Sequence, residues 1–185
     1  IPDEETQDKI ASFLGQIDRK IENNEAINRN LEDQANALFM AYFIEQRMVV
    51  YSDYKDTEYG RIPSCWTFMD LGDVGLDISD GNYSSKYPKT DEFLSEGIPF
   101  IRGTDFNGTS INQSNMMYIS SEKHAELKKG HTKKGDILIT TRGDIGRIAF
   151  VPDSLIDVNI NSQLVRINGC DIVPRAFLAC FLTSS

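Results

Sequence analysis

The first 47 residues carry a narrow stripe of mainly hydrophobic residues, spaced alternately four and three positions apart. This is the clearest pattern in the chain. A stripe of this width and period is typical of a coiled coil, in which each side chain inserts between residues of a facing helix. Two asparagines lie in its middle, where they would fix the register against a partner at a cost in stability. The seam consists of Ile10, Leu14, Ile17, Ile21, Asn24, Asn28, Leu31, Ala35, Leu38 and Tyr42.

This pattern predicts one long helix over residues 1–47, with Asp3 as its N-terminal cap. No second helix of comparable length follows in the sequence. We therefore expect the seam to be covered by a second copy of this chain, through self-association, or by a helix outside this sequence.

Residues 48–63 form a polar, turn-prone connector, and after Pro63 the pattern changes to short apolar runs broken by Gly, Asn, Asp and Ser. Such a segment indicates an α+β domain with a mixed sheet and long loops over residues 64–185. The expected strands are Thr67–Leu71, Phe100–Arg102, Met116–Ile119, Ile137–Thr141, Ile148–Val151 and Leu164–Ile167, and the expected helices are Ser121–Lys128 and Pro174–Leu182.

Charge is unevenly distributed along the chain, whose formal net charge is -9. The predicted helix holds ten acids and five bases, a balance of -5. Between Lys123 and Arg147, seven bases face three acids, a balance of +4. A basic segment in an acidic protein is compatible with phosphate binding, although charge alone favours a solvated basic loop somewhat more.

The sequence shows no arrangement of residues that indicates catalysis. The two histidines, His124 and His131, fit no nucleophile–base spacing, and Gly143–Gly146 has only the outline of a GxxG loop, which a turn between strands explains. The three cysteines show neither pairing nor metal-ligand spacing, which favours a reducing, cytoplasmic setting. We expect that this chain is not an enzyme and that it binds no metal and no cofactor. We also expect no membrane span.

Polar loops rich in base-reading and phosphate-binding side chains remain as candidate chemistry. Ordinary turn chemistry explains each loop singly, but several loops and a basic segment in one domain favour nucleic acid. The candidate phosphate contacts are Lys86, Lys128, Lys133, Lys134 and Arg147; the candidate base-edge contacts are Asn82, Arg102, Arg142, Asn161 and Gln163, accompanied by Tyr83 and Thr104.

Two regions resemble a known family. The helical region carries Ile1–Ala11, then Leu14, Asp18, Lys20–Glu22 and Asn30–Glu32. The later region carries Trp66, Leu71–Val74, Ile98–Arg102, Gly135–Ile139, Arg142-Gly143 with Gly146, and Phe177-Leu178 with Phe181-Leu182. In this order they resemble the spacer helix and one target recognition domain of the specificity subunit of type I restriction-modification systems.

The resemblance implies a non-catalytic subunit that binds double-stranded DNA. Such subunits carry two recognition domains joined by two antiparallel helices, and each domain reads one half of a bipartite site. The helices dock modification subunits, which use S-adenosylmethionine to methylate adenine, and a restriction subunit is bound indirectly. This chain departs from that pattern with one helix and one domain, so we expect a C-terminal fragment or a half-length subunit.

A different class of function also fits the residues. An acidic coiled-coil protein could use its globular domain to bind protein instead of DNA. A basic surface on the same side as the Arg102 and Asn161 loops would favour DNA, whereas scattered lysines would favour the alternative.

Overall fold

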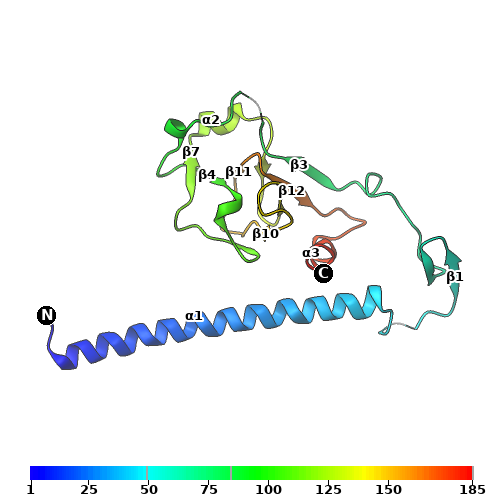
Figure 1. Cartoon of the computed structure of the whole chain (residues 1–185), viewed down its shortest axis with the longest axis horizontal. Coiled ribbons are helices and arrows are strands. Elements are labelled where there is room, and N and C mark those ends of the chain that lie inside the picture. The colour runs from blue at the N-terminus through cyan, green and yellow to red at the C-terminus, as the bar shows by residue number, and fades with distance from the viewer. Residues whose placement is uncertain (49, 84, 185) are drawn as a thin grey trace. The chain divides into compact units, whose positions relative to one another are not determined.

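The computed structural model describes residues 1–48, 50–83 and 85–184. The chain divides into two compact units, residues 1–54 and 55–183, which are described separately below. Figure 1 shows the long helix of the first unit and the strands and short helices of the second.

The first unit is dominated by helix α1 (Glu4–Phe39), which continues into a π-helical turn, Met40–Ile44. Asp3 caps it as expected, because the backbone N–H of Thr6 donates to Asp3 Oδ1 at 2.8 Å. The helix ends before Arg47, since Gln46 adopts the left-handed backbone (φ 53°) that commonly stops a helix.

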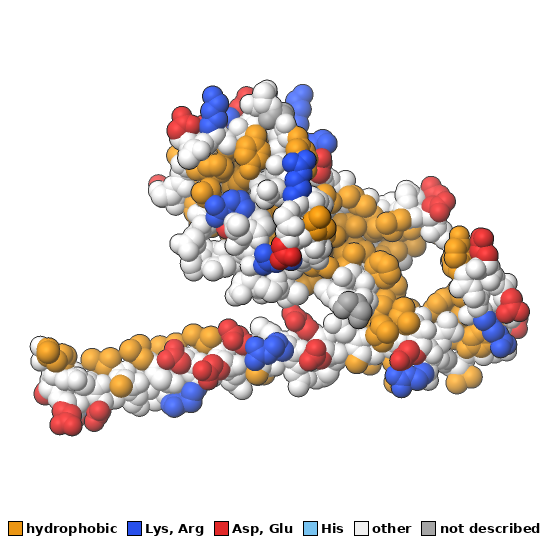
Figure 2. Space-filling model, in the orientation of Figure 1, with side chains coloured by type: hydrophobic (Ala, Val, Ile, Leu, Met, Phe, Trp, Pro, Cys, Tyr) orange, Lys and Arg blue, Asp and Glu red, His pale blue; other side chains and the backbone are white. Residues whose placement is uncertain are grey.

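The seam residues of α1 stay exposed in the described part of the chain. Ile10 is 48% and Leu31 is 58% exposed, and Asn24 and Asn28 are exposed between them. Figure 2 shows hydrophobic side chains following one edge of this helix. No helix among the described residues combines the length and apolar character that a membrane crossing requires.

The segment predicted as a connector contains a β-hairpin. Strands β1 (Tyr54–Thr57) and β2 (Gly60–Pro63) pair around a turn in which the Thr57 hydroxyl donates to the Gly60 carbonyl at 2.6 Å. Gly60 has φ 110°, which favours glycine. The boundary predicted at residue 63 therefore falls at the end of a strand.

Among the described residues of the second unit, two four-stranded sheets form the framework. In the first, the order is β10–β9–β12–β3, and every pair is antiparallel. Its strands are β3 (Asp77–Asp80), β9 (Ile137–Thr140), β10 (Ile148–Phe150) and β12 (Leu164–Asn168).

The second sheet has the order β7–β4–β11–β8 and contains one parallel pair, β4 with β11. It is thus the mixed sheet that the sequence predicted. Its strands are β4 (Ile98–Ile101), β7 (Met117–Ile119), β8 (His131–Thr132) and β11 (Val158–Ile160), and a small separate pair is formed by β5 (Phe106–Asn107) and β6 (Ser110–Ile111).

Most of the buried apolar side chains of the described residues form three clusters. Successive residues of one strand can belong to different clusters. Leu138 of β9 joins Ile101 of β4 and Ile160 of β11 in the main cluster between the two sheets. Its neighbour Ile137 instead packs with Leu178 of helix α3 (Arg175–Thr183). The successive residues of a strand point to opposite faces, so both faces of this sheet are covered.

On the second sheet, Phe100 and Ile119 pack with Leu127, which follows helix α2 (Ser121–Glu126). Single-turn 3₁₀ helices, Thr90–Glu92 and Gly103–Asp105, lie in its loops. The expected strands beginning at Phe100, Met116, Ile137, Ile148 and Leu164 are confirmed within one or two residues.

The prediction of a strand at Thr67–Leu71 is wrong. Phe68, Met69 and Leu71 are exposed, and two turns bracket the segment. In those turns the Trp66 N–H donates to the Pro63 carbonyl and the Asp73 N–H donates to the Asp70 carbonyl, both at 2.9 Å. A short apolar run without a neighbouring strand to complete a ladder does not produce a sheet.

Candidate nucleic-acid interface

The parallel pairing of β4 and β11 brings two predicted recognition loops together. Asn159 lies opposite Phe100 and Ile160 opposite Ile101, so both strands end at the same edge. The next residue in each chain segment begins a loop, and the Asn161 N–H donates to the Ile101 carbonyl at 2.9 Å. Arg102 and Asn161 therefore start neighbouring loops.

The antiparallel sheet places two further loops beside these. Leu164 of β12 pairs with Thr140 of β9, and Val165 pairs with Asp80 of β3. The loops after β9 and β3 and before β12 consequently meet. The Thr141 N–H and hydroxyl donate to the Gln163 carbonyl at 2.8 and 3.0 Å.

We call this region the loop edge: residues 81–83, 102–105, 141–147 and 161–163. Its loops approach so closely that a Cβ on Gly81 would lie 2.0 Å from the Asn161 carbonyl oxygen. Gly103 is also close, since an added Cβ would lie 3.2 Å from Thr140 Cγ2. The loop edge is thus a packed surface built from four separate chain segments.

Tyr83 and Arg142 are in contact on the exposed side of the loop edge. The Arg142 Cζ atom lies 5.0 Å from the centroid of the Tyr83 ring, within the range of a cation–π contact. Tyr83 is 49% exposed, and Arg142 is also exposed. The pair presents a planar cation stacked on an aromatic face to solvent.

A groove of about 410 Å³ continues from Tyr83 toward α2. Ion pairs organise part of its wall: Lys86 Nζ lies 3.2 Å from Glu126, and Lys129 Nζ lies 2.8 Å from Asp80. Basic side chains outnumber acidic ones along it, which suits a polyanionic ligand. The lining residues are Asn82, Tyr83, Ser85, Lys86, Glu126, Lys128 and Lys129.

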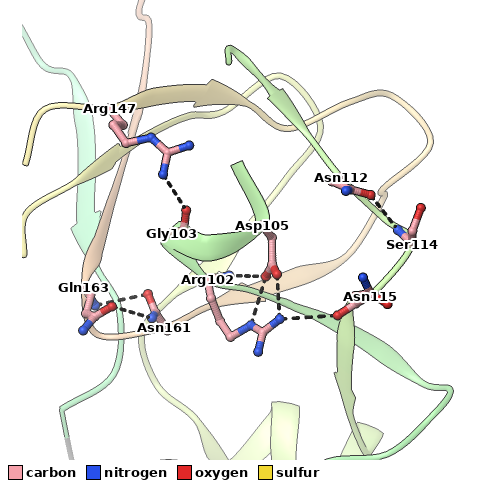
Figure 3. Close-up of polar contacts among 9 residues, drawn as sticks. All are labelled: Arg102, Gly103, Asp105, Asn112, Ser114, Asn115, Arg147, Asn161 and Gln163. Carbon is pink, nitrogen blue, oxygen red and sulfur yellow. Dashed lines mark hydrogen bonds and ion pairs between the residues drawn. The ribbon is translucent and has the colours of Figure 1, made fainter. Parts of the chain in front are cut away.

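Arg102 belongs to the loop edge, but its guanidinium is hydrogen-bonded to other groups of the protein (Figure 3). Nη2 donates to Asp105 Oδ1 at 2.6 Å and Nε donates to Oδ2 at 3.1 Å, while Nη2 also donates to the Asn115 carbonyl at 3.3 Å. These bonds to Asp105 raise the pKa of Arg102 above its usual range. Thr104, on the same turn, is exposed.

Arg147 is likewise held by backbone carbonyls. Nη1 donates to Gly103 at 3.3 Å (Figure 3), and Nη2 donates to Phe106 at 2.9 Å. Its Cζ lies 5.6 Å from the centroid of the Phe106 ring. Arg147 therefore ties the loop after β9 to the turn after β4, and its predicted role as a phosphate contact is not supported by this geometry.

Asn82 and Asn161 lie at the loop edge with buried side chains, each only 6% exposed. Asn161 Oδ1 accepts from the Gln163 N–H at 3.2 Å, and its amide nitrogen donates to Gln163 Oε1 at 3.3 Å (Figure 3). Both side chains are therefore packed into the loop edge, and Asn82 also lines the groove. Gln163 itself is exposed.

Lys133 and Lys134 lie apart from the other candidate contact residues. They precede β9, whereas Arg142 follows it, and the start of β9 pairs with the end of β12. At that end the Lys133 N–H donates to Asp136 Oδ2 at 3.0 Å, and Asn168 donates to Asp136 Oδ1 at 2.6 Å. The basic segment between Lys123 and Arg147 is therefore divided between two ends of the sheet.

The sequence prediction left out Ser85 and Lys129, which line the groove, and Asp105, which fixes Arg102. Lys129 follows Lys128 directly, so the adjacent pair was a usable signal. Nothing local marks Asp105, because its role depends on the 3₁₀ turn that returns its carboxylate to Arg102.

Comparison with known proteins agrees with this architecture. Residues 63–185 match the family model of the type I restriction modification DNA specificity domain. The chain is 32% identical over 124 residues to the EcoBI type I restriction enzyme specificity subunit of Escherichia coli, covering 66% of this chain and 26% of that protein. It is 30% identical over 168 residues to the MjaIX specificity subunit of Methanocaldococcus jannaschii, covering 85% and 37%.

Solved structures share the fold of the whole chain. The HsdS subunit from Thermoanaerobacter tengcongensis matches with a TM-score of 0.56 at 19% identity, covering 100% of this chain and 42% of that one. The S subunit from M. genitalium matches equally, with a TM-score of 0.56 and coverage of 98% and 42%. This chain thus spans well under half the length of its relatives. The extent of the family match shows that the chain belongs to the type I restriction modification DNA specificity domain family.

Proposed function

We propose that the second unit is a DNA-recognition module that reads one half of a bipartite site with its loop edge. Family membership and the names of the relatives as specificity subunits support this. The observation that carries it is the exposed Tyr83–Arg142 pair, which lies beside a groove lined by Lys86, Lys128 and Lys129.

The chemistry of this surface suits a DNA duplex. An arginine side chain can donate two parallel hydrogen bonds to guanine in the major groove, and lysines bind phosphates without regard to sequence. Arg142, Gln163 and Thr104 are exposed at the loop edge and would face bases. Lys86, Lys128 and Lys129 would face the phosphate backbone.

The other predicted contacts receive different roles. Arg102 and Arg147 hold loops in place, and Asn82 and Asn161 are buried within the loop edge. Lys133 and Lys134 lie outside the proposed interface.

For α1 we propose the role of a spacer. Its exposed seam would pair with a second helix, and the pair would set the distance between two half-site readers and dock the modification subunits. S-adenosylmethionine would be bound by those subunits, a restriction subunit would join indirectly, and this chain would catalyse no step.

The test is Arg142→Ala in the complete complex with the modification subunits, with Lys134→Ala as the matched control. Loss of a two-bond arginine contact removes about 1–3 kcal/mol of discrimination, roughly 5- to 150-fold. Sequencing of methylated positions should show relaxed choice at one position of the half-site for Arg142→Ala only. Unchanged site choice in that variant would contradict the assignment.

The alternative, a protein-binding domain, is favoured by the net charge of -9 and by the separation of Lys133 and Lys134 from the groove. The two functions differ in salt dependence. The DNA module alone should bind random duplex with a Kd of about 10⁻⁴–10⁻⁶ M, or more weakly, and lose affinity as salt rises. Absence of any salt-sensitive DNA binding, by the chain or by its complex, would favour the alternative.

A further inference from the structure

Three side chains far apart in the sequence converge next to α2. His124 lies on α2, His131 begins β8, and Asp157 immediately precedes β11. Their possible ligand atoms all lie within 4.8 Å of one another, and the two imidazole rings have centroids 4.1 Å apart. None of these residues lines the groove or takes part in the proposed DNA contacts.

We propose that His124, His131 and Asp157 bind one zinc ion. Two imidazoles and a carboxylate form a ligand set that zinc accepts, with a fourth position left for water. In a tetrahedral complex with metal–ligand bonds of about 2.0–2.1 Å, the ligand atoms lie about 3.3 Å apart. His124 Nε2 and Asp157 Oδ1 already lie 3.2 Å apart.

His131 has the tautomer that this site needs. Its Nε2 lies within hydrogen-bonding distance of the Leu127 carbonyl oxygen. A carbonyl can only accept, so Nε2 carries the proton and Nδ1 keeps its lone pair. Metal-binding histidines commonly donate their other ring N–H to a backbone carbonyl in this way.

His124 has a comparable supporting group in Asn159. The Asn159 amide nitrogen lies 3.5 Å from His124 Nδ1, while its buried Oδ1 has no hydrogen-bond partner among the described residues. Rotating the amide by 180° would let Oδ1 accept the Nδ1–H of His124, which leaves Nε2 free for the metal. That rotation gives the buried Asn159 Oδ1 a donor.

The three ligands differ in exposure. His124 is buried, with only 8% of its surface exposed. The Asp157 side chain is 59% exposed, so it can turn toward the ion and leave an entry path. Sequence spacing does not reveal this ligand set, because Asp157 lies 26 residues beyond His131 and the β8–β11 pairing brings the two residues together.

Bound zinc would connect α2, β8 and the segment before β11. The turn between α2 and β8 carries Lys128 and Lys129, so the ion would also restrain that part of the groove wall. The metal site itself does not depend on the proposed DNA contacts.

The experiment is calorimetric titration of the EDTA-stripped full chain with zinc chloride, followed by thermal unfolding. We expect one zinc ion per chain and a Tm increase of roughly 5–10 °C when free zinc exceeds the Kd about a hundredfold. Asp157→Asn and His131→Gln should each weaken binding at least about tenfold. Asp153→Asn, which changes another exposed acid of the same loop, should bind like the unmodified chain.

Absence of zinc binding by the unmodified chain would overturn the proposal, and so would equal binding by Asp157→Asn. Titration with cobalt(II) identifies the ligands: a thiolate charge-transfer band would assign the ion to cysteines and overturn the proposal. Asp157 is exposed, so its variant remains decisive even if His131→Gln disturbs folding, as checked by circular dichroism.

Discussion

Asp105 holds the guanidinium of Arg102 through Oδ1, which lies 2.6 Å from Nη2, and through Oδ2, which lies 3.1 Å from Nε. The carboxylate is only 5% exposed, whereas Arg102 is partly exposed. A buried carboxylate without its cation is costly, so this ion pair links the loop after β4 to the stability of the domain.

Arg102→Ala should lower the free energy of unfolding by about 3 kcal/mol, because Asp105 would remain buried without its cation. Arg142→Ala should lower it by no more than about 1 kcal/mol, because only an exposed cation–π contact is lost. Urea unfolding of both variants measures the difference. Equal changes would show that the Arg102–Asp105 pair is not a structural element.

Gly81→Ala tests the close packing of the loop edge. The added Cβ would lie 2.0 Å from the Asn161 carbonyl oxygen and 2.5 Å from its carbon, so backbone must move. We expect a loss of at least about 1–3 kcal/mol in unfolding free energy. Gly72→Ala is the control, because a Cβ there meets nothing within 4 Å, and its effect should stay within about 0.5 kcal/mol. Similar effects in both variants would contradict the packing argument.

The Asp77–Arg166 pair predicts a pH-dependent contribution to stability. Arg166 donates to both oxygens of Asp77, at 2.7 and 3.0 Å, and these bonds lower the Asp77 pKa below its usual 3.8. A carboxyl group whose pKa is lowered by folding stabilises the fold at pH values above its unfolded-state pKa. This stabilisation is lost as the pH falls through the folded-state pKa.

Asp77→Asn should therefore lower the free energy of unfolding by up to about 1 kcal/mol at pH 7, as expected for an exposed pair. It should have no effect at a pH where Asp77 is protonated in the folded protein. Urea unfolding of Asp77→Asn, with Asp73→Asn as an exposed control, measures this over a pH series. A difference that persists unchanged at the acid end would exclude the ionic origin.

Local apolar patterning was sufficient to predict the long helix and five strands of the two sheets. It missed β3, β8 and β11. Asp77–Asp80 is half acidic, β8 has only two residues, and Val158–Ile160 has a buried Asn at its centre. These strands depend on their neighbours: β3 pairs with β12, and β11 lies between β4 and β8. Their stability comes from ladders and packing that a local window of sequence does not contain.

The candidate site was predictable as a set of loops but not as a set of free side chains. The strand register explains why the loops at Asn82, Arg102, Arg142 and Asn161 meet. Arg147 is bound by carbonyls 41 and 44 residues away, a commitment that composition and spacing do not reveal. Residue type identified chemistry suited to DNA, while tertiary hydrogen bonds decided which residues remain available for it.

The seam of α1 predicts self-association that a single charge should abolish. Leu31 is 58% exposed on this seam, and pairing of two seams would bury it against apolar neighbours. Leu31→Glu would place a carboxylate in that interface, where its desolvation opposes pairing. Sedimentation of the chain should show a dimer that becomes a monomer in this variant, with the second unit still folded.

Ala26→Glu is the matched control, because residue 26 is exposed and lies on the side of α1 away from the seam. It adds the same charge to the same helix, so a dimer that survives Ala26→Glu and not Leu31→Glu assigns the contact to the seam. A chain that remains monomeric at high concentration would instead show that the seam requires a different helix. In that case, adding a separate spacer helix from a full-length relative should restore pairing with the unmodified chain and not with Leu31→Glu.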